Sequence, residues 1–145
     1  MPTNVFILVY VGDPLDYAMY RHTALFFENS NGSTCAMHIT GAHGFFEFEA
    51  YDNYDPVQHG QLARKISVAE LSDSISAASI RDAVSRTLVK NGRADADWNC
   101  QNWVADALTR MVDRGLLSLS QRAAAINEMT DACLEAADEQ VSDFA

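Results

Sequence analysis

The first half of the chain alternates short apolar runs with turn residues, a pattern typical of β-strands. An apolar run from Val5 to Val11 is stopped by Gly12-Asp13-Pro14. Further along, Phe46-Glu47-Phe48-Glu49 alternates strictly, as a strand with one exposed face does. We therefore expect strands at 4–12, 22–28, 34–40 and 45–51, and a further one within 61–71.

The second half changes to the three- and four-residue spacing of amphipathic helices. We expect helices at 76–90, 99–114 and 118–140. The first carries Ile80, Val84 and Leu88 at four-residue spacing and ends before Asn91-Gly92, a helix stop. The last carries apolar residues in steps of seven, beginning at Leu119. Strands followed by helices predict an α+β fold, in which a mostly antiparallel sheet is followed by helices.

Length and composition add that the chain forms one domain, 1–145, with a β-rich half at 4–71 and a helical half at 76–140. The hydrophobic fraction of 48% and the charged fraction of 21% are those of a globular protein. The formal net charge of −10 argues against nucleic acid or an anionic membrane surface as a partner. Neither composition nor pattern predicts an oligomeric state.

Two features bear on the compartment. The apolar run near the N-terminus is too short to span a bilayer and lacks the flanks of a signal peptide. The three cysteines, Cys35, Cys100 and Cys133, form an odd set without close spacing, which makes a disulfide framework improbable. We therefore expect a reducing, cytoplasmic location.

One cysteine differs from the other two in its surroundings. Cys100 lies in the polar stretch DWNCQN, where either Asp97 or Asn99 can cap the following helix. Either cap places Cys100 in the first helical turn, where free N–H groups and the macrodipole favour a thiolate and lower the thiol pKa. Cys35 and Cys133 lie among apolar residues and are interpreted as packing residues.

A thiolate nucleophile needs a base, and two histidines lie on strands joined by one hairpin. A three-residue loop, Ser30-Asn31-Gly32, would put His22 and His38 on one face as diagonal neighbours. A two-residue Asn31-Gly32 turn would put them on opposite faces. The pattern alone leaves both registers open.

Other chemistries are less well supported. His22, His38, His43 and Cys100 could supply zinc ligands, but no Cys-x-x-Cys or His-x-x-x-His spacing is present. The Gly-x-Ser-x-Gly motif, the phosphate loop and the dinucleotide fingerprint are also missing. We therefore expect no metal and no cofactor.

These motifs resemble those of a known superfamily. YRHTALFF at 20–27, His38 on the next strand and NCQNWV at 99–104 resemble the circularly permuted papain-like cysteine enzymes of the NlpC/P60 superfamily. The closest pattern is that of the lecithin:retinol acyltransferase-like branch, and the desumoylating isopeptidase-like branch is similar as well. In the first branch Glu and His follow the cysteine, where this chain has Gln101 and Asn102.

The resemblance implies that Cys100 is the nucleophile, His22 the general base and His38 the residue that orients His22. The N–H of Cys100 would contribute to an oxyanion hole. Substrate binding or further oxyanion contacts are expected from Tyr20, Trp98 and Gln101. In the isopeptidase-like branch a Cys–His pair works alone, which would leave His38 without a catalytic role.

The expected function is a soluble cysteine-dependent hydrolase or acyl-transfer enzyme acting on an amide, ester or thioester. Its substrate would be a small molecule, such as a biosynthetic intermediate, or a peptide. The alternative is a catalytically inactive binding or interaction module on the same scaffold, which the substitutions after the cysteine would permit.

Overall fold

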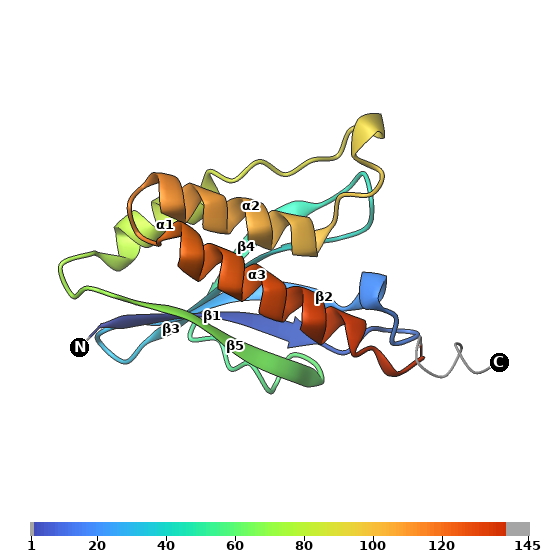
Figure 1. The fold of residues 1–145 in the computed structure, drawn as a ribbon, viewed down its shortest axis with the longest axis horizontal. Helices are drawn as coiled ribbons and strands as arrows, with labels where there is room; N and C mark the ends of the chain where they lie inside the picture. Colours follow the sequence, from blue (N-terminus) through green and yellow to red (C-terminus); the bar gives the residue numbers. More distant parts are fainter. Residues whose placement is uncertain (1, 139–145) are drawn as a thin grey trace.

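The computed structural model describes residues 2–138 and shows one sheet with helices on one of its faces (Figure 1). The strands are β1 (Thr3–Tyr10), β2 (His22–Glu28), β3 (Thr34–Thr40), β4 (Glu47–Asp52) and β5 (Leu62–Leu71). The helices are α1 (Ala77–Ser85), α2 (Cys100–Asp113) and α3 (Leu119–Leu134), and the short 3₁₀ turns are η1 (Ala18–Tyr20) and η2 (Arg93–Asp95). No helix within 2–138 is long and apolar enough to cross a membrane.

The sheet has the order β4-β3-β2-β1-β5, and all its neighbouring strands are antiparallel. Helices α2 and α3 pack on the sheet, and α1 packs beside α2. This arrangement confirms the predicted α+β class, a mostly antiparallel sheet followed by helices.

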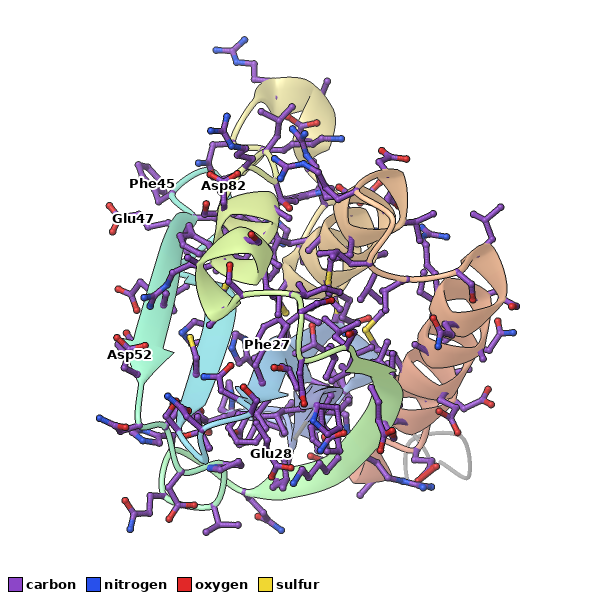
Figure 2. The ribbon with its side chains drawn as sticks, turned by 90° about the vertical axis from the view of Figure 1, so that its left-hand side faces the viewer. Phe27, Glu28, Phe45, Glu47, Asp52 and Asp82 are labelled. Carbon is purple, nitrogen blue, oxygen red and sulfur yellow. The ribbon has the colours of Figure 1, made fainter. Side chains whose placement is uncertain are left out.

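Successive residues of β2 point to opposite faces of the sheet, as the pleat requires. Leu25 and Phe27 belong to the main core between the sheet and the helices. Ala24 and Phe26 belong to a smaller cluster on the outer face, together with Tyr54. Figure 2 shows Phe27 on the helix side of the strands. His22 is separated from Ala24 and Phe26 by an even number of positions along β2, so it belongs to the outer face with them.

The β2–β3 hairpin has the three-residue loop and not the two-residue turn. Glu28 pairs with Thr34, and the N–H of Asn29 donates to the carbonyl of Ser33 at 2.8 Å. Gly32 has φ +88°, a left-handed conformation that glycine adopts without strain. The register that places His22 and His38 on one face is thus the observed one.

Strand β1 ends at Tyr10, before the predicted end at residue 12, and two further element boundaries also differ from the prediction. Strand β4 begins at Glu47, two residues late, because the N–H and carbonyl of Phe46 bond to the side chain of Asn91. Helix α1 ends at Ser85, where the N–H of Thr87 donates to the carbonyl of Val84. Leu88, expected on the apolar face, is 69% exposed.

The buried face of α3 is also rotated from the predicted one. Of the predicted series, Leu119 is 73% exposed, while Ile126 packs against the core and Cys133 is buried as expected; Ala125 and Met129, outside the series, are buried with them. Steps of seven drift around a straight helix, so spacings of four and three define its apolar face better. The helix ends at Leu134, and positions 139–140 of the predicted helix lie outside the described residues.

A buried ion pair ties the start of β2 to the end of α3. The Nε and Nη2 atoms of Arg21 donate to the carboxylate of Asp16 at 2.9 and 2.8 Å, and Nη1 donates to the carbonyl of Ala132 at 2.8 Å. The N–H of Ala137 donates to the same carboxylate at 2.9 Å. The bonds from Arg21 hold the pKa of Asp16 well below its usual value.

Candidate active site

Cys100 is the first residue of α2, and Asn99, the second of the two expected caps, precedes it. The Asn99 side chain accepts hydrogen bonds from the N–H groups of Gln101 and Asn102, and the Asn102 side chain accepts one from the N–H of Asn99. As the first helical residue, Cys100 has no acceptor for its own N–H within the helix. That N–H is available to a bound oxyanion.

The thiol of Cys100 is protonated in this environment, which corrects the expectation of a lowered pKa. Burial raises the pKa of Cys100 and outweighs the lowering effect of nearby backbone N–H groups. The half-buried sulfur lies 3.8 Å from the carbonyl oxygen of Arg21, to which the thiol donates. The helix N-terminus is therefore not sufficient to produce a thiolate at rest.

His22 and His38 form a directly hydrogen-bonded pair where β2 begins. The Nε2 atom of His22 lies 2.8 Å from Nδ1 of His38, and the two rings meet edge to face with centroids 4.9 Å apart. Burial, with a smaller contribution from His38, lowers the pKa of His22 to about 4. His22 is thus neutral at neutral pH, and its Nδ1 atom has no hydrogen bond within the described part of the chain.

The environment of His38 extends this pair toward β4. His38 lies directly opposite Glu49 in the β3–β4 register, and its Nε2 atom is 3.9 Å from a Glu49 oxygen. That nitrogen is buried and has no hydrogen-bond partner among the described residues. Burial lowers the pKa of His38, while Glu49 acts in the opposite direction.

Cys100 and His22 line one cavity of about 700 Å³ at the N-terminus of α2, a volume typical of small-molecule sites. The other lining residues come from η1, the end of β3 with the following turn, and the segment before α2: Met19, Tyr20, Ile39, Thr40, Gly41, Ala42, His43, Phe46, Ala96, Asp97 and Asn99. No Lys or Arg lines the cavity within 2–138, and Asp97 is its one carboxylate.

His22 also borders a second cavity, of about 510 Å³, on the outer face of the sheet. This outer cavity is lined by His38, Tyr10, Tyr54 and His59 as well. The described side chains include no hydrogen bond between the sulfur of Cys100 and either histidine. The structure therefore brings His22 and His38 into contact, and it brings Cys100 to the same cavity as His22 without a direct bond.

The three further residues expected to bind substrate have different positions. Tyr20 lines the cavity and is 46% exposed, but its ring stacks on Tyr17 and makes no hydrogen bond to His22. Gln101 instead donates both amide hydrogens, to the carbonyls of Ala18 and Arg21 at 2.7 and 3.2 Å. These bonds join the start of α2 to the start of β2, so Gln101 links the two elements and its amide nitrogen is not free for substrate.

Trp98 is a core residue, which is the second correction. It is 8% exposed, packs edge to face on Phe46, and donates from Nε1 to Asp106 at 3.1 Å. Its ring fixes the approach of the chain to α2 and does not line the cavity. An aromatic residue two positions before a helix start gives no sign, from sequence alone, of which side it faces.

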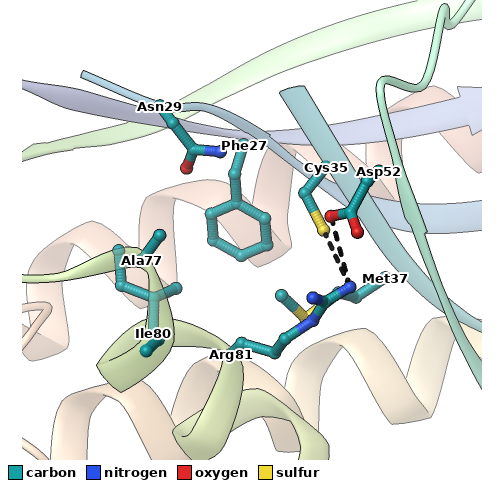
Figure 3. Close-up of a pocket in the computed structure, with 9 residues that line it drawn as sticks. Phe27, Asn29, Cys35, Met37, Asp52, Ala77, Ile80 and Arg81 are labelled. Carbon is teal, nitrogen blue, oxygen red and sulfur yellow. Dashed lines mark hydrogen bonds and ion pairs between the residues drawn. The ribbon is translucent and has the colours of Figure 1, made fainter. Parts of the chain in front are cut away.

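Neither a metal site nor a second thiol site with a base is formed by the described residues. No group of three or more His, Cys, Asp or Glu side chains within 2–138 is arranged to hold a metal ion. A smaller cavity, of about 240 Å³, contains Cys35 beside Arg81 and Asp52 (Figure 3). That cavity has no imidazole, and burial raises the pKa of Cys35.

Sequence reasoning missed Glu49 and His59 near the histidine pair. Alternation along 45–51 indicates that Glu49 is on an exposed face, but pairing it with His38 requires the register of the β3–β4 turn. His59 stacks on Tyr54 with ring centroids 4.4 Å apart. It lies in an irregular segment whose path no local pattern predicts.

Comparison with known proteins places the chain in a family whose activity is not established. Searches of curated proteins and of solved structures returned no match. A family model matches residues 7–118, which include β2, β3, α1 and α2 and therefore both histidines and Cys100. The chain belongs to this family, DUF6540, a family of unknown function.

Proposed function

We propose that this protein is a cysteine-dependent hydrolase or acyl-transfer enzyme with a permuted papain-like site. Cys100 is the nucleophile, His22 the general base, and His38 the residue that orients His22. The observation that carries the proposal is the cavity lined by both Cys100 and His22. The chain order agrees with the permuted enzymes that the motifs resemble, because the histidine strand precedes the cysteine helix.

The pKa directions favour a neutral resting pair. Burial raises the thiol pKa of Cys100 and lowers the imidazole pKa of His22 to about 4, so both shifts disfavour a thiolate–imidazolium pair at rest. The base must therefore act while the new bond forms. Since Nε2 of His22 is engaged by His38, Nδ1 is the atom that accepts the proton.

The reaction then proceeds in two balanced halves. The sulfur of Cys100 attacks the substrate carbonyl carbon as its proton moves to His22, and the N–H of Cys100 donates to the developing oxyanion. The intermediate expels its leaving group, which takes the proton from His22, and an acyl-thioester remains. Water or another nucleophile then gives its proton to His22 and attacks the thioester carbon. As the C–S bond breaks, the sulfur of Cys100 takes that proton from His22, and the acyl group leaves bonded to the new nucleophile.

The cavity favours a substrate with an apolar acyl group and no negative charge. Its side walls include Met19, Ile39 and Phe46, and no cationic side chain faces it within 2–138, whereas Asp97 would repel an anion. We therefore expect a p-nitrophenyl hexanoate probe to acylate the protein faster than the mono-p-nitrophenyl ester of adipic acid, which has the same chain length and a terminal carboxylate. A faster reaction with the anionic ester would contradict this substrate class.

Intact-mass spectrometry at neutral pH tests the nucleophile directly. Brief incubation with p-nitrophenyl hexanoate should add one hexanoyl group, which peptide mapping should locate on Cys100. Cys100→Ala should remove the adduct, His22→Gln should slow its formation, and Cys35→Ala, which changes a thiol without an adjacent imidazole, should leave it unchanged. Equal slow acylation of all three cysteines would refute the proposal.

One observation favours the alternative of a binding module. The Cys100 thiol donates to the carbonyl of Arg21 and is not bonded to an imidazole. A scaffold that had lost turnover would keep the cavity and bind a neutral, apolar ligand there without acylation. Saturable binding of hexanamide, with no adduct on Cys100 from the ester probe, would support this alternative over the enzyme.

A further inference from the structure

Glu49 is the one acidic side chain within ion-pair distance of the histidine pair among the described residues. It is the cross-strand partner of His38, and one of its oxygens lies 3.9 Å from the buried, unbonded Nε2 of that ring. We propose that Glu49 is a positioning residue that selects the tautomers of His38 and His22, and thereby leaves Nδ1 of His22 free to act as the base. This inference rests on the proposed function of Cys100 and His22.

The contact between the two rings permits two neutral arrangements. In the first, His22 donates from Nε2–H to Nδ1 of His38, so the hydrogen of His38 is on its Nε2 and Nδ1 of His22 keeps its lone pair. In the second, His38 donates from Nδ1–H, and the hydrogen of His22 is then on Nδ1. Only in the first arrangement can Nδ1 of His22 accept a proton from a thiol.

The charge of Glu49 distinguishes these arrangements. In the first, an N–H of His38 points toward the carboxylate, which is an attraction; in the second, a lone pair points toward it, which is a repulsion. The separation of 3.9 Å makes this an electrostatic contact and not a hydrogen bond. Tyr51, whose hydroxyl donates to the carboxylate of Glu49, restrains that side chain from the same strand.

Glu49 is the carboxylate in contact with the pair. The titratable groups that face His38 are His22 on β2, Glu49 and Tyr51 on β4, and His59 in the segment between β4 and β5. Asp13 lines the outer cavity with both rings but forms no ion pair with either of them among the described residues. The imidazoles and the phenol of Tyr51 carry no negative charge, so they do not favour a hydrogen on Nε2 of His38. Glu47, two residues before Glu49 and on the same face of β4, pairs with Thr40 and provides a matched control (Figure 2).

Nitrogen-15 NMR of the four imidazoles tests the tautomers without requiring turnover. In the wild-type protein at neutral pH, we expect His22 and His38 both to carry their hydrogen on Nε2. Glu49→Gln should convert His38 to a mixture of tautomers, and Glu47→Gln should not. Wild-type spectra with the hydrogen of His38 on Nδ1 would overturn the inference, as would tautomers that do not respond to Glu49→Gln.

Acylation by p-nitrophenyl hexanoate tests the consequence at Cys100. Outer partners that orient metal-bound histidines contribute about 10- to 100-fold to activity, and by analogy Glu49→Gln should slow acylation within that range. Glu47→Gln should change it by less than about twofold. If the wild-type protein forms no adduct on Cys100, the proposed function fails; if it forms one that Glu49→Gln does not slow, the role of Glu49 alone fails.

Discussion

Acidification between pH 7 and pH 5 should destabilise the folded protein through His22. The folded state holds this ring neutral and lowers its pKa from 6.5 to about 4, because the ring is buried beside His38. The unfolded chain therefore binds more protons in this window, and the free energy of unfolding decreases as pH falls from about 6.5 to about 4. Each unit of pKa difference between the folded and unfolded states is worth 1.36 kcal/mol, so the free energy of unfolding should fall by about 3 kcal/mol in all.

The free energy of unfolding should already have fallen by about 2 kcal/mol at pH 5. Most carboxylates are still ionised at that pH, so their protonation contributes little to the change. Urea denaturation followed by tryptophan fluorescence can measure it, because Trp98 and Trp103 are both buried and report on unfolding. The control is His22→Gln, which should keep only the part of the loss that the buried ring of His38 contributes. A wild-type loss below about 0.5 kcal/mol, or an equal loss in His22→Gln, would refute the burial argument.

Three other predictions follow from the surrounding structure. Asp16→Ala leaves the buried guanidinium of Arg21 without its carboxylate, so the free energy of unfolding should fall by about 3–5 kcal/mol in urea denaturation, and a loss below about 1 kcal/mol would contradict the buried pair. Gly41→Ala places a Cβ 2.7 Å from the carbonyl oxygen of Phe45 at φ +106°, and should cost about 1–3 kcal/mol in the same assay. Iodoacetamide should label Cys100 slowly at pH 7 and faster as pH approaches 9, and fast labelling at pH 7 would contradict a raised thiol pKa.

The parts of the fold that depend on local pattern were predictable from the sequence. Strands β2 and β3 have the predicted bounds, since each is an apolar run closed by turn residues. The contact between His22 and His38 was one of two alternatives, and the pairing of Glu28 with Thr34 around a three-residue loop decides between them. For the start of α2 the sequence left two capping residues open, Asp97 and Asn99, and Asn99 is the one observed.

The incorrect predictions concern side chains whose partners are distant in sequence. Gln101 was expected at the substrate and instead bonds to carbonyls about 80 positions earlier. Leu88 was expected in the core, but α1 ends before it, and the Nη2 of Arg110 on α2 donates to the carbonyl of Arg86 at that end. The raised pKa of Cys100 follows from packing against β2, which helix position alone does not reveal.

The link between Arg21 and the end of α3 affects how a shortened version of the protein should be designed. The family match ends at residue 118, and residues up to that point include all the strands and the whole cavity at α2. Yet the carbonyl of Ala132 and the N–H of Ala137 complete the bonds of the ion pair beside His22. A fragment cut at the family boundary would leave two buried charges partly unsatisfied next to His22, so expression trials should retain the chain through 138.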